Sequence, residues 1–224
     1  MSLNAPVVTV DGPGGAGKGT VSLRTATVLG WHYLDSGALY RALGLLATRN
    51  EIALNDEPAL VKLAKNLELE FRNDQVLLDG EFVDRLIRSE QAGDRASRIA
   101  PLAGVRRALL DWQRACAKPP GLVADGRDMG SVVFPAAICK IYLTASAEAR
   151  AKRRFNQLRL KGFDVNIRQL FEEITERDQR DANRPVSPLR PAEDAFLLDT
   201  TELTIEQAVE EVLKLVQSAL DLSE

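Results

Sequence analysis

The stretch from Val7 to Thr20 constrains the fold of this chain more strongly than any other. Val7–Asp11 is mostly β-branched and precedes a glycine-rich turn, which predicts a buried strand. The glycines allow successive backbone N–H groups to point inward at phosphate oxygens. Lys18 adds a mobile charge, and Lys18–Val28 can form a helix whose N-terminal dipole also favours an anion. The predicted phosphate-binding loop consists of Gly12, Pro13, Gly14, Gly15, Ala16, Gly17, Lys18, Gly19 and Thr20.

Gly19 departs from the most common form of this loop. Ser or Thr usually follows the lysine directly, whereas the hydroxyl of this chain comes one residue later, at Thr20. The order Gly-Lys-Gly-Thr resembles the loop of the nucleoside monophosphate kinases, in which Mg²⁺ is held largely through water and phosphate. The same departure argues against a regulatory P-loop switch, which is the alternative from a different class of protein.

The rest of the chain alternates short apolar runs with stretches of helical spacing. The apolar runs predict further core strands at 31–34, 122–125, 139–143 and 195–199. The helical spacing predicts helices at 38–48, 57–66, 85–100, 102–116 and 147–161, with others from 167 and from 205 onward. Between 67 and 83 the period changes to alternation, which predicts a small antiparallel meander.

These patterns predict an α/β protein with the P-loop fold, in which helices flank a five-stranded parallel sheet. A small antiparallel β insertion and a helical lid complete the prediction. If the resemblance of the loop to nucleoside monophosphate kinases holds for the whole chain, it implies a core kinase domain of residues 1–59 and 99–224 and an inserted NMP-binding subdomain at 60–98. The arginine-rich lid and its adjoining helices are expected at about 150–184, within the core.

Charged side chains at predicted strand and helix ends suggest phosphate chemistry. Asp125 ends a buried strand, where a carboxylate opens on the ligand crevice of a parallel sheet and can organise waters around Mg²⁺. Arg41, shortly after a predicted helix cap, suits a substrate phosphate. In the lid, whose helices flank a break at 162–164, we expect the nucleotide to meet Arg153 or Arg154, Arg177 and Arg184. Arg150 and Arg159 are expected to be solvated.

Three further segments, together with the loop, resemble the bacterial cytidylate kinases. They are Leu34–Arg41, Ala124–Gly130 and Glu176–Arg184. The resemblance covers nearly the whole chain and includes the insertion of roughly forty residues between about Leu60 and Ser97 that marks the bacterial type. It implies transfer of the γ-phosphoryl group of ATP to CMP or dCMP, with Mg²⁺ bound alongside ATP.

The resemblance also implies a role for each matching residue. Lys18 and the loop would hold ATP, with Arg153 or Arg154 closing from the lid, and Asp125 would reach Mg²⁺ through water, with no direct protein ligand. Arg41 and Arg127 would clamp the CMP phosphate, while Ser97, Arg106 and Asp128 would read cytosine. Asp128 would accept from the N4 amino group, which uracil lacks. Arg177 and Asp181 would hold the sugar and Arg184 would bridge base or phosphate. The implied catalytic residues are Lys18, Arg127 and Arg184, and Ser36 and Asp125 complete the implied substrate-binding set.

The sequence leaves one enzymatic alternative open and argues against other partners. The acceptor phosphate is already anionic at neutral pH, so no general base is required. Kinases of hydroxyl groups do need one, and Asp35 could supply it in a shikimate-like or dephospho-coenzyme A-like kinase. A net charge of −3 argues against a nucleic-acid partner. Without a long apolar run or a signal pattern, we expect a cytoplasmic protein with no membrane partner. We also expect a monomer.

Overall fold

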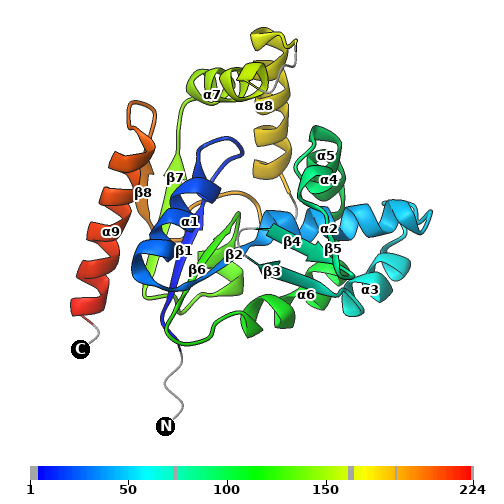
Figure 1. Cartoon of the computed structure of the whole chain (residues 1–224), viewed down its shortest axis with the longest axis horizontal. Helices are drawn as coiled ribbons and strands as arrows, with labels where there is room; N and C mark the ends of the chain where they lie inside the picture. Colours follow the sequence, from blue (N-terminus) through cyan, green and yellow to red (C-terminus); the bar gives the residue numbers. More distant parts are fainter. Residues whose placement is uncertain (1–4, 73–74, 161–163, 185, 223–224) are drawn as a thin grey trace. The chain divides into compact units, whose positions relative to one another are not determined.

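The computed structural model describes residues 5–72, 75–160, 164–184 and 186–222. The chain divides into two compact units (Figure 1). The first combines Met1–Tyr33 with Ala117–Glu224, and the second is Leu34–Cys116. The insertion expected at 60–98 lies inside the second unit, which extends beyond it at both ends. Its role as the NMP-binding subdomain stays a prediction.

A five-stranded parallel sheet carries the loop. Its strand order is β2-β6-β1-β7-β8, and the pairs β1–β6, β1–β7 and β7–β8 are all parallel. The strands are β1 (Val7–Asp11), β2 (His32–Asp35), β6 (Leu122–Gly126), β7 (Cys139–Thr144) and β8 (Phe196–Asp199). All five predicted core strands are confirmed to within one residue at each end. β1 is central and buried at every position, which fits a sequence in which three of the five residues are valines.

Among the described residues of the first unit, four long helices and one short turn accompany the sheet. They are α1 (Lys18–Leu29), α7 (Ala147–Leu160), α8 (Ile167–Ala182), α9 (Ile205–Asp221) and the π-helical turn η1 (Met129–Val133). α7 and α8 lie side by side (Figure 1), and α1 contacts both β6 and α9. The predicted lid break at 162–164 falls mostly on residues 161–163, which lie outside the described residues.

The second unit has its own hydrophobic core, built around Leu39, Leu43, Leu60 and Leu109. A three-stranded antiparallel sheet of order β3-β4-β5 confirms the predicted meander. The elements of this unit are α2 (Ser36–Arg49), α3 (Glu57–Lys65), β3 (Leu69–Arg72), β4 (Gln75–Leu78), β5 (Glu81–Phe82), α4 (Asp84–Ile87), α5 (Glu90–Ile99) and α6 (Ala103–Ala115).

The single helix predicted over 85–100 is wrong. α4 ends at Ile87. Ser89 has an extended backbone, with φ −73° and ψ 158°, which interrupts the helical path, and it is the N-cap of the next helix, α5. The Ser89 hydroxyl accepts a hydrogen bond of 3.2 Å from the Ala92 N–H. A serine offers the backbone this alternative to a continuous helix, and apolar periodicity alone does not reveal it.

None of the helices in the described part of the chain combines the length and the apolar character that a membrane span requires.

Candidate active site

The loop after β1 is shaped by glycines at two demanding positions. A Cβ atom at Gly12 would lie 1.9 Å from the Leu143 carbonyl oxygen of β7, so only glycine permits this close exit from the sheet. Gly17 precedes α1 with φ 94° and ψ 4°, a left-handed conformation. No side chain in the described part of the chain caps α1, so the N–H groups of its first turn can face a bound anion.

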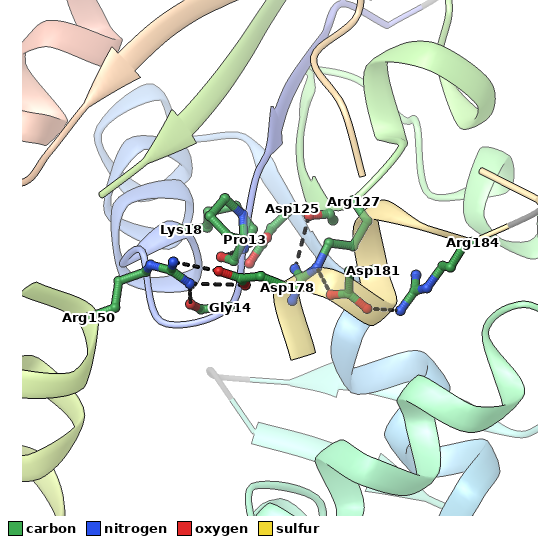
Figure 2. A network of polar contacts seen from close by, with 10 residues as sticks. Pro13, Gly14, Lys18, Asp125, Arg127, Arg150, Asp178, Asp181 and Arg184 are labelled. Atoms are coloured by element: carbon green, nitrogen blue, oxygen red, sulfur yellow. Dashed lines mark hydrogen bonds and ion pairs between the residues drawn. The ribbon is translucent and has the colours of Figure 1, made fainter. Parts of the chain in front are cut away.

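Lys18 is the buried cation of the loop. Its side chain is 6% exposed, and its Nζ donates to the Pro13 carbonyl oxygen at 2.9 Å (Figure 2). Burial, followed by the positive charge of Arg127, lowers the pKa of Lys18 to about 7, although Asp125 and Asp11 act in the opposite direction. The loop therefore holds a desolvated ammonium group whose charge an incoming phosphate would stabilise.

Asp125 lies beside Gly19, the position at which phosphate-binding loops usually carry a serine or threonine hydroxyl. Its carboxylate is 3.9 Å from Lys18 Nζ and accepts from the Tyr33 hydroxyl at 3.4 Å. A Cβ atom at Gly19 would lie 3.4 Å from the Asp125 carboxylate. Within the described ranges no group of three or more His, Cys, Asp or Glu could hold a metal ion. The carboxylate beside the loop fits a magnesium ion that water and phosphate also hold, and that role of Asp125 stays a prediction.

Asp181 holds two of the predicted site arginines on one carboxyl group (Figure 2). Arg127 Nε donates to one of its oxygens at 3.0 Å, and Arg184 pairs with the other. Asp181 is fully buried. Burial alone would raise its pKa, but Arg127 and Arg184 outweigh that effect and hold the pKa below its ordinary value. The pairing joins the residue after β6 to the last turn of α8.

Arg127 and Arg177 both border the phosphate loop. A Cβ atom at Gly14 would lie 3.5 Å from Arg127 Nη2 and 3.8 Å from Arg177 Nε. Both arginines also act electrostatically on Lys18 and lower its pKa. The structure thus brings three cations predicted from separate segments of the chain to the same loop.

Arg150, expected to be solvated, is buried, and that prediction is wrong. Its guanidinium pairs with both carboxylate oxygens of Asp178, at 3.0 and 2.5 Å, and donates to the Gly14 carbonyl at 3.0 Å (Figure 2). The reason is the packing of α7 against α8, which leaves Arg150 on the covered side. Arg159 is exposed, as expected, and its guanidinium lies 5.9 Å from the centre of the Phe155 ring.

Arg153 and Arg154 have different surroundings. Arg153 donates to backbone carbonyls of the connection between β8 and α9, among them Thr200. Arg154 donates to Gln157 within α7 at 2.7 Å. Which of the two meets ATP stays a prediction.

The remaining predicted substrate residues of the second unit are Ser36, Arg41, Ser97 and Arg106. Ser36 begins α2 and is buried, and Arg41 lies in the same helix. Ser97 is buried in α5. Arg106, in α6, donates to the Ala100 carbonyl at 3.3 Å. Their roles stay predictions.

Asp11 was not singled out from the sequence, yet it is a central acid of the first unit. Its two carboxylate oxygens accept from the backbone N–H groups of Met129 and Gly130, each at 2.8 Å. Burial raises its pKa to about 7, although both hydrogen bonds act against the rise. A signal was available, since Asp11 ends a buried parallel strand, and Asp125 is the last residue but one of the neighbouring strand β6.

The sheet, the glycine loop with its buried lysine and the surrounding arginines define a P-loop protein that binds nucleotide phosphates. A family model described as cytidylate kinase matches residues 8–218. A cytidylate kinase of Vibrio cholerae is 56% identical over 98% of this chain and 100% of its own. A cytidylate kinase of Photobacterium profundum is 54% identical over 99% of each chain. The chain belongs to the cytidylate kinase family.

Solved structures with low sequence identity share the fold. A gluconokinase from Sinorhizobium meliloti superposes with a TM-score of 0.50 at 16% identity, covering 100% of this chain and 98% of its own. An uncharacterized protein from Eubacterium ventriosum gives a TM-score of 0.51 at 10% identity, over 95% of this chain and 98% of its own. At these identities the likeness concerns the fold alone.

Replacing Arg150 with Ala should destabilise the protein, because Asp178 and the Gly14 carbonyl lose their donor. Asp178 is partly exposed, so we expect a loss of about 2–3 kcal/mol in unfolding free energy. The matched control is Arg159→Ala in the same helix, with an expected change within about 0.5 kcal/mol. Urea denaturation followed by circular dichroism measures both, and equal effects would contradict the assignment.

Asp11 should make stability depend on pH. Its folded pKa of about 7 exceeds its ordinary 3.8, so the folded state binds this proton more tightly. The contribution of Asp11 is therefore greatest below about pH 4 and is lost as pH rises to about 7. The unfolding free energy of the wild type relative to Asp11→Asn should fall by roughly 2–4 kcal/mol across this range. A difference that does not vary with pH would refute this expectation.

Proposed function

We propose that this chain transfers the γ-phosphoryl group of ATP to CMP or dCMP, giving ADP and CDP or dCDP. The observation that carries the proposal is the gathering of Lys18, Arg127 and Arg177 at the phosphate loop of a chain of this family. Three cations at one loop suit a reaction in which negative charge spreads over the transferred group.

The acceptor is a phosphate monoester that already carries negative charge at neutral pH, so it needs no base. The chain contributes alignment and neutralisation of charge. Lys18 and the loop N–H groups bind the donor phosphates, and Arg127 and Arg184 meet the charge of the transfer. Asp181 orients both arginines, so they need little reorganisation when substrate binds. Mg²⁺, bound with ATP and reached by Asp125 through water, would neutralise phosphate charge.

The acceptor contacts are part of the same proposal. Arg41 and Arg127 clamp the CMP phosphate, because two planar guanidinium groups can share one anion. Asp128, which is buried, accepts from the N4 amino group of cytosine, with Ser97 and Arg106 completing the base contacts.

The ribose contacts include a residue that is already paired. Arg177 and Asp181 hold the sugar, and Arg184 extends to base or phosphate. Asp181 is engaged by two arginines, but a carboxylate has about four acceptor positions, so a sugar hydroxyl can still donate to it. Ser36 supports the acceptor from the first turn of α2.

A kinase of a small-molecule hydroxyl is the alternative that shares this loop. Such an enzyme would use Asp35 as its base. One oxygen of Asp35 accepts from the Ala38 N–H at 2.8 Å as the cap of α2, which gives this carboxyl a structural role.

We further propose that the enzyme acts as a cytoplasmic monomer without nucleic-acid or membrane partners.

The test of the function is the initial rate of ADP production with Mg·ATP and one acceptor at a time. The acceptors are CMP, dCMP, UMP, AMP, GMP, dTMP and shikimate. CMP and dCMP should dominate, and Lys18→Ala should abolish transfer while its circular dichroism spectrum stays that of the wild type. A preference for shikimate would overturn the proposal in favour of a hydroxyl kinase.

The substitution Asp128→Ala tests whether Asp128 recognises the cytosine base. Loss of a hydrogen bond between a carboxylate and the cytosine amino group should lower kcat/KM for CMP by about 10-fold to 100-fold. UMP should lose much less, since its carbonyl gains nothing from Asp128. Steady-state kinetics with both acceptors decide the matter, and equal losses would remove Asp128 from base recognition.

A further inference from the structure

Asp11 connects two functional stretches of the first unit through one side chain. It is the last residue of β1, and the phosphate loop starts at the next position. Its carboxylate accepts from Met129 and Gly130, which directly follow Arg127 and Asp128. A single side chain therefore joins the strand that delivers the donor loop to the segment that carries the proposed acceptor contacts.

Arg127 and Asp128 lie between β6 and the short turn η1, and Met129 and Gly130 are the first two residues of that turn. β6 ends at Gly126, and Asp128 precedes the short turn η1 with φ −150° and ψ 27°. The first N–H groups of a helical turn have no acceptor within that turn. The Asp11 carboxylate supplies acceptors for the N–H groups of Met129 and Gly130 and so restrains the backbone next to Asp128.

The same segment is packed tightly onto β1 at Gly130. A Cβ atom there would lie 2.8 Å from Thr9 Oγ1 and 3.2 Å from Lys140 Cδ. The two hydrogen bonds to the Asp11 carboxylate and the close contact of Gly130 with Thr9 leave the backbone of this segment little room to move. A shift at Gly130 would therefore be transmitted to Asp128, two residues earlier.

A buried carboxyl group at Asp11 lowers the stability of the folded protein, since burial disfavours the charged form of the group. Lys18 offers some compensating charge, while Asp128 adds repulsion. An apolar residue at the end of β1 would avoid this cost but would leave two buried backbone donors without acceptors. An aspartate at this position, unlike an apolar residue, holds the segment after β6 in a fixed position.

We propose that Asp11 is a positioning residue that sets Arg127 and Asp128 relative to the phosphate loop and thereby controls discrimination between CMP and UMP. This inference rests on the proposed function. It predicts that disturbing Asp11 impairs acceptor selection more than it impairs binding of ATP, because the loop is also held by its own glycines and by α1.

The test variant is Asp11→Asn, which keeps the shape of the side chain. Its amide oxygen can still accept from one N–H group, but its NH₂ group would face the other donor. The matched control is Thr9→Val on the same buried strand, because Thr9 Oγ1 is buried and makes no hydrogen bond within the described structure. The control removes a polar atom near Gly130 without touching the two bonds from Asp11.

Three quantities are measured for the wild type and both variants. They are the ratio of kcat/KM for CMP to that for UMP, the dissociation constant of Mg·ATP, and the hydrogen exchange rates of the Met129 and Gly130 amides by NMR. In Asp11→Asn the CMP/UMP ratio should fall by about tenfold or more, with at least tenfold faster exchange. Affinity for Mg·ATP should change by less than about threefold. Thr9→Val should stay within about twofold in every measurement.

An unchanged CMP/UMP ratio in Asp11→Asn, or unchanged amide exchange, would overturn the proposal. A variant that loses CMP turnover, UMP turnover and Mg·ATP affinity in equal proportion would also overturn it, since that pattern indicates general destabilisation. Failure of the proposed function has a different signature, because the wild type itself would then show no preference for CMP. The amide exchange would still report whether Asp11 holds the segment.

Discussion

The burial of a positive charge inside the phosphate loop is the constraint on which the rest of this structure depends. Lys18 has little access to solvent, and its pKa is lowered to about 7 by burial and by a neighbouring arginine. A desolvated cation of this kind is tolerated only where fixed dipoles and counter-charges surround it. The Pro13 carbonyl and Asp125 supply these around Lys18.

Further charged residues of the first unit are likewise paired with opposite charges or with backbone groups. Asp11 holds backbone N–H groups, Asp178 pairs with Arg150, and Asp181 pairs with Arg127 and Arg184. Under the proposed function, Arg127 and Arg184 would bring charge that a transferred phosphoryl group needs, and Asp181 fixes where that charge lies. In this network the carboxylates, the arginines and the backbone N–H groups hold one another in position.

Much of the fold followed from local patterns. The central strands β1, β6 and β7 matched to within one residue because buried parallel strands are rich in β-branched and apolar residues. The edge strands β2 and β8 matched as well, although most of their residues are not buried. The helix over 85–100 failed at Ser89, where a capping hydroxyl outweighed apolar periodicity. Within the arginine-rich helices, sequence could not separate buried from exposed positions. Arg150 and Arg159 look alike in the chain, and only the packing of α7 on α8 distinguishes them.

The sequence by itself determined the phosphate loop, since glycine spacing and a following helix are local properties of a few adjacent residues. It also identified the family, through segments that resemble cytidylate kinases along nearly the whole chain. Only the tertiary structure decided which acid pairs with which base. Arg127 and Asp181 stand 54 positions apart, and Asp11 lies 118 positions from Met129. Asp11 meets Met129 because the parallel sheet brings the carboxyl ends of distant strands to one edge, and Arg127 meets Asp181 because the last turn of α8 lies beside the residue that follows β6. No local pattern encodes either meeting.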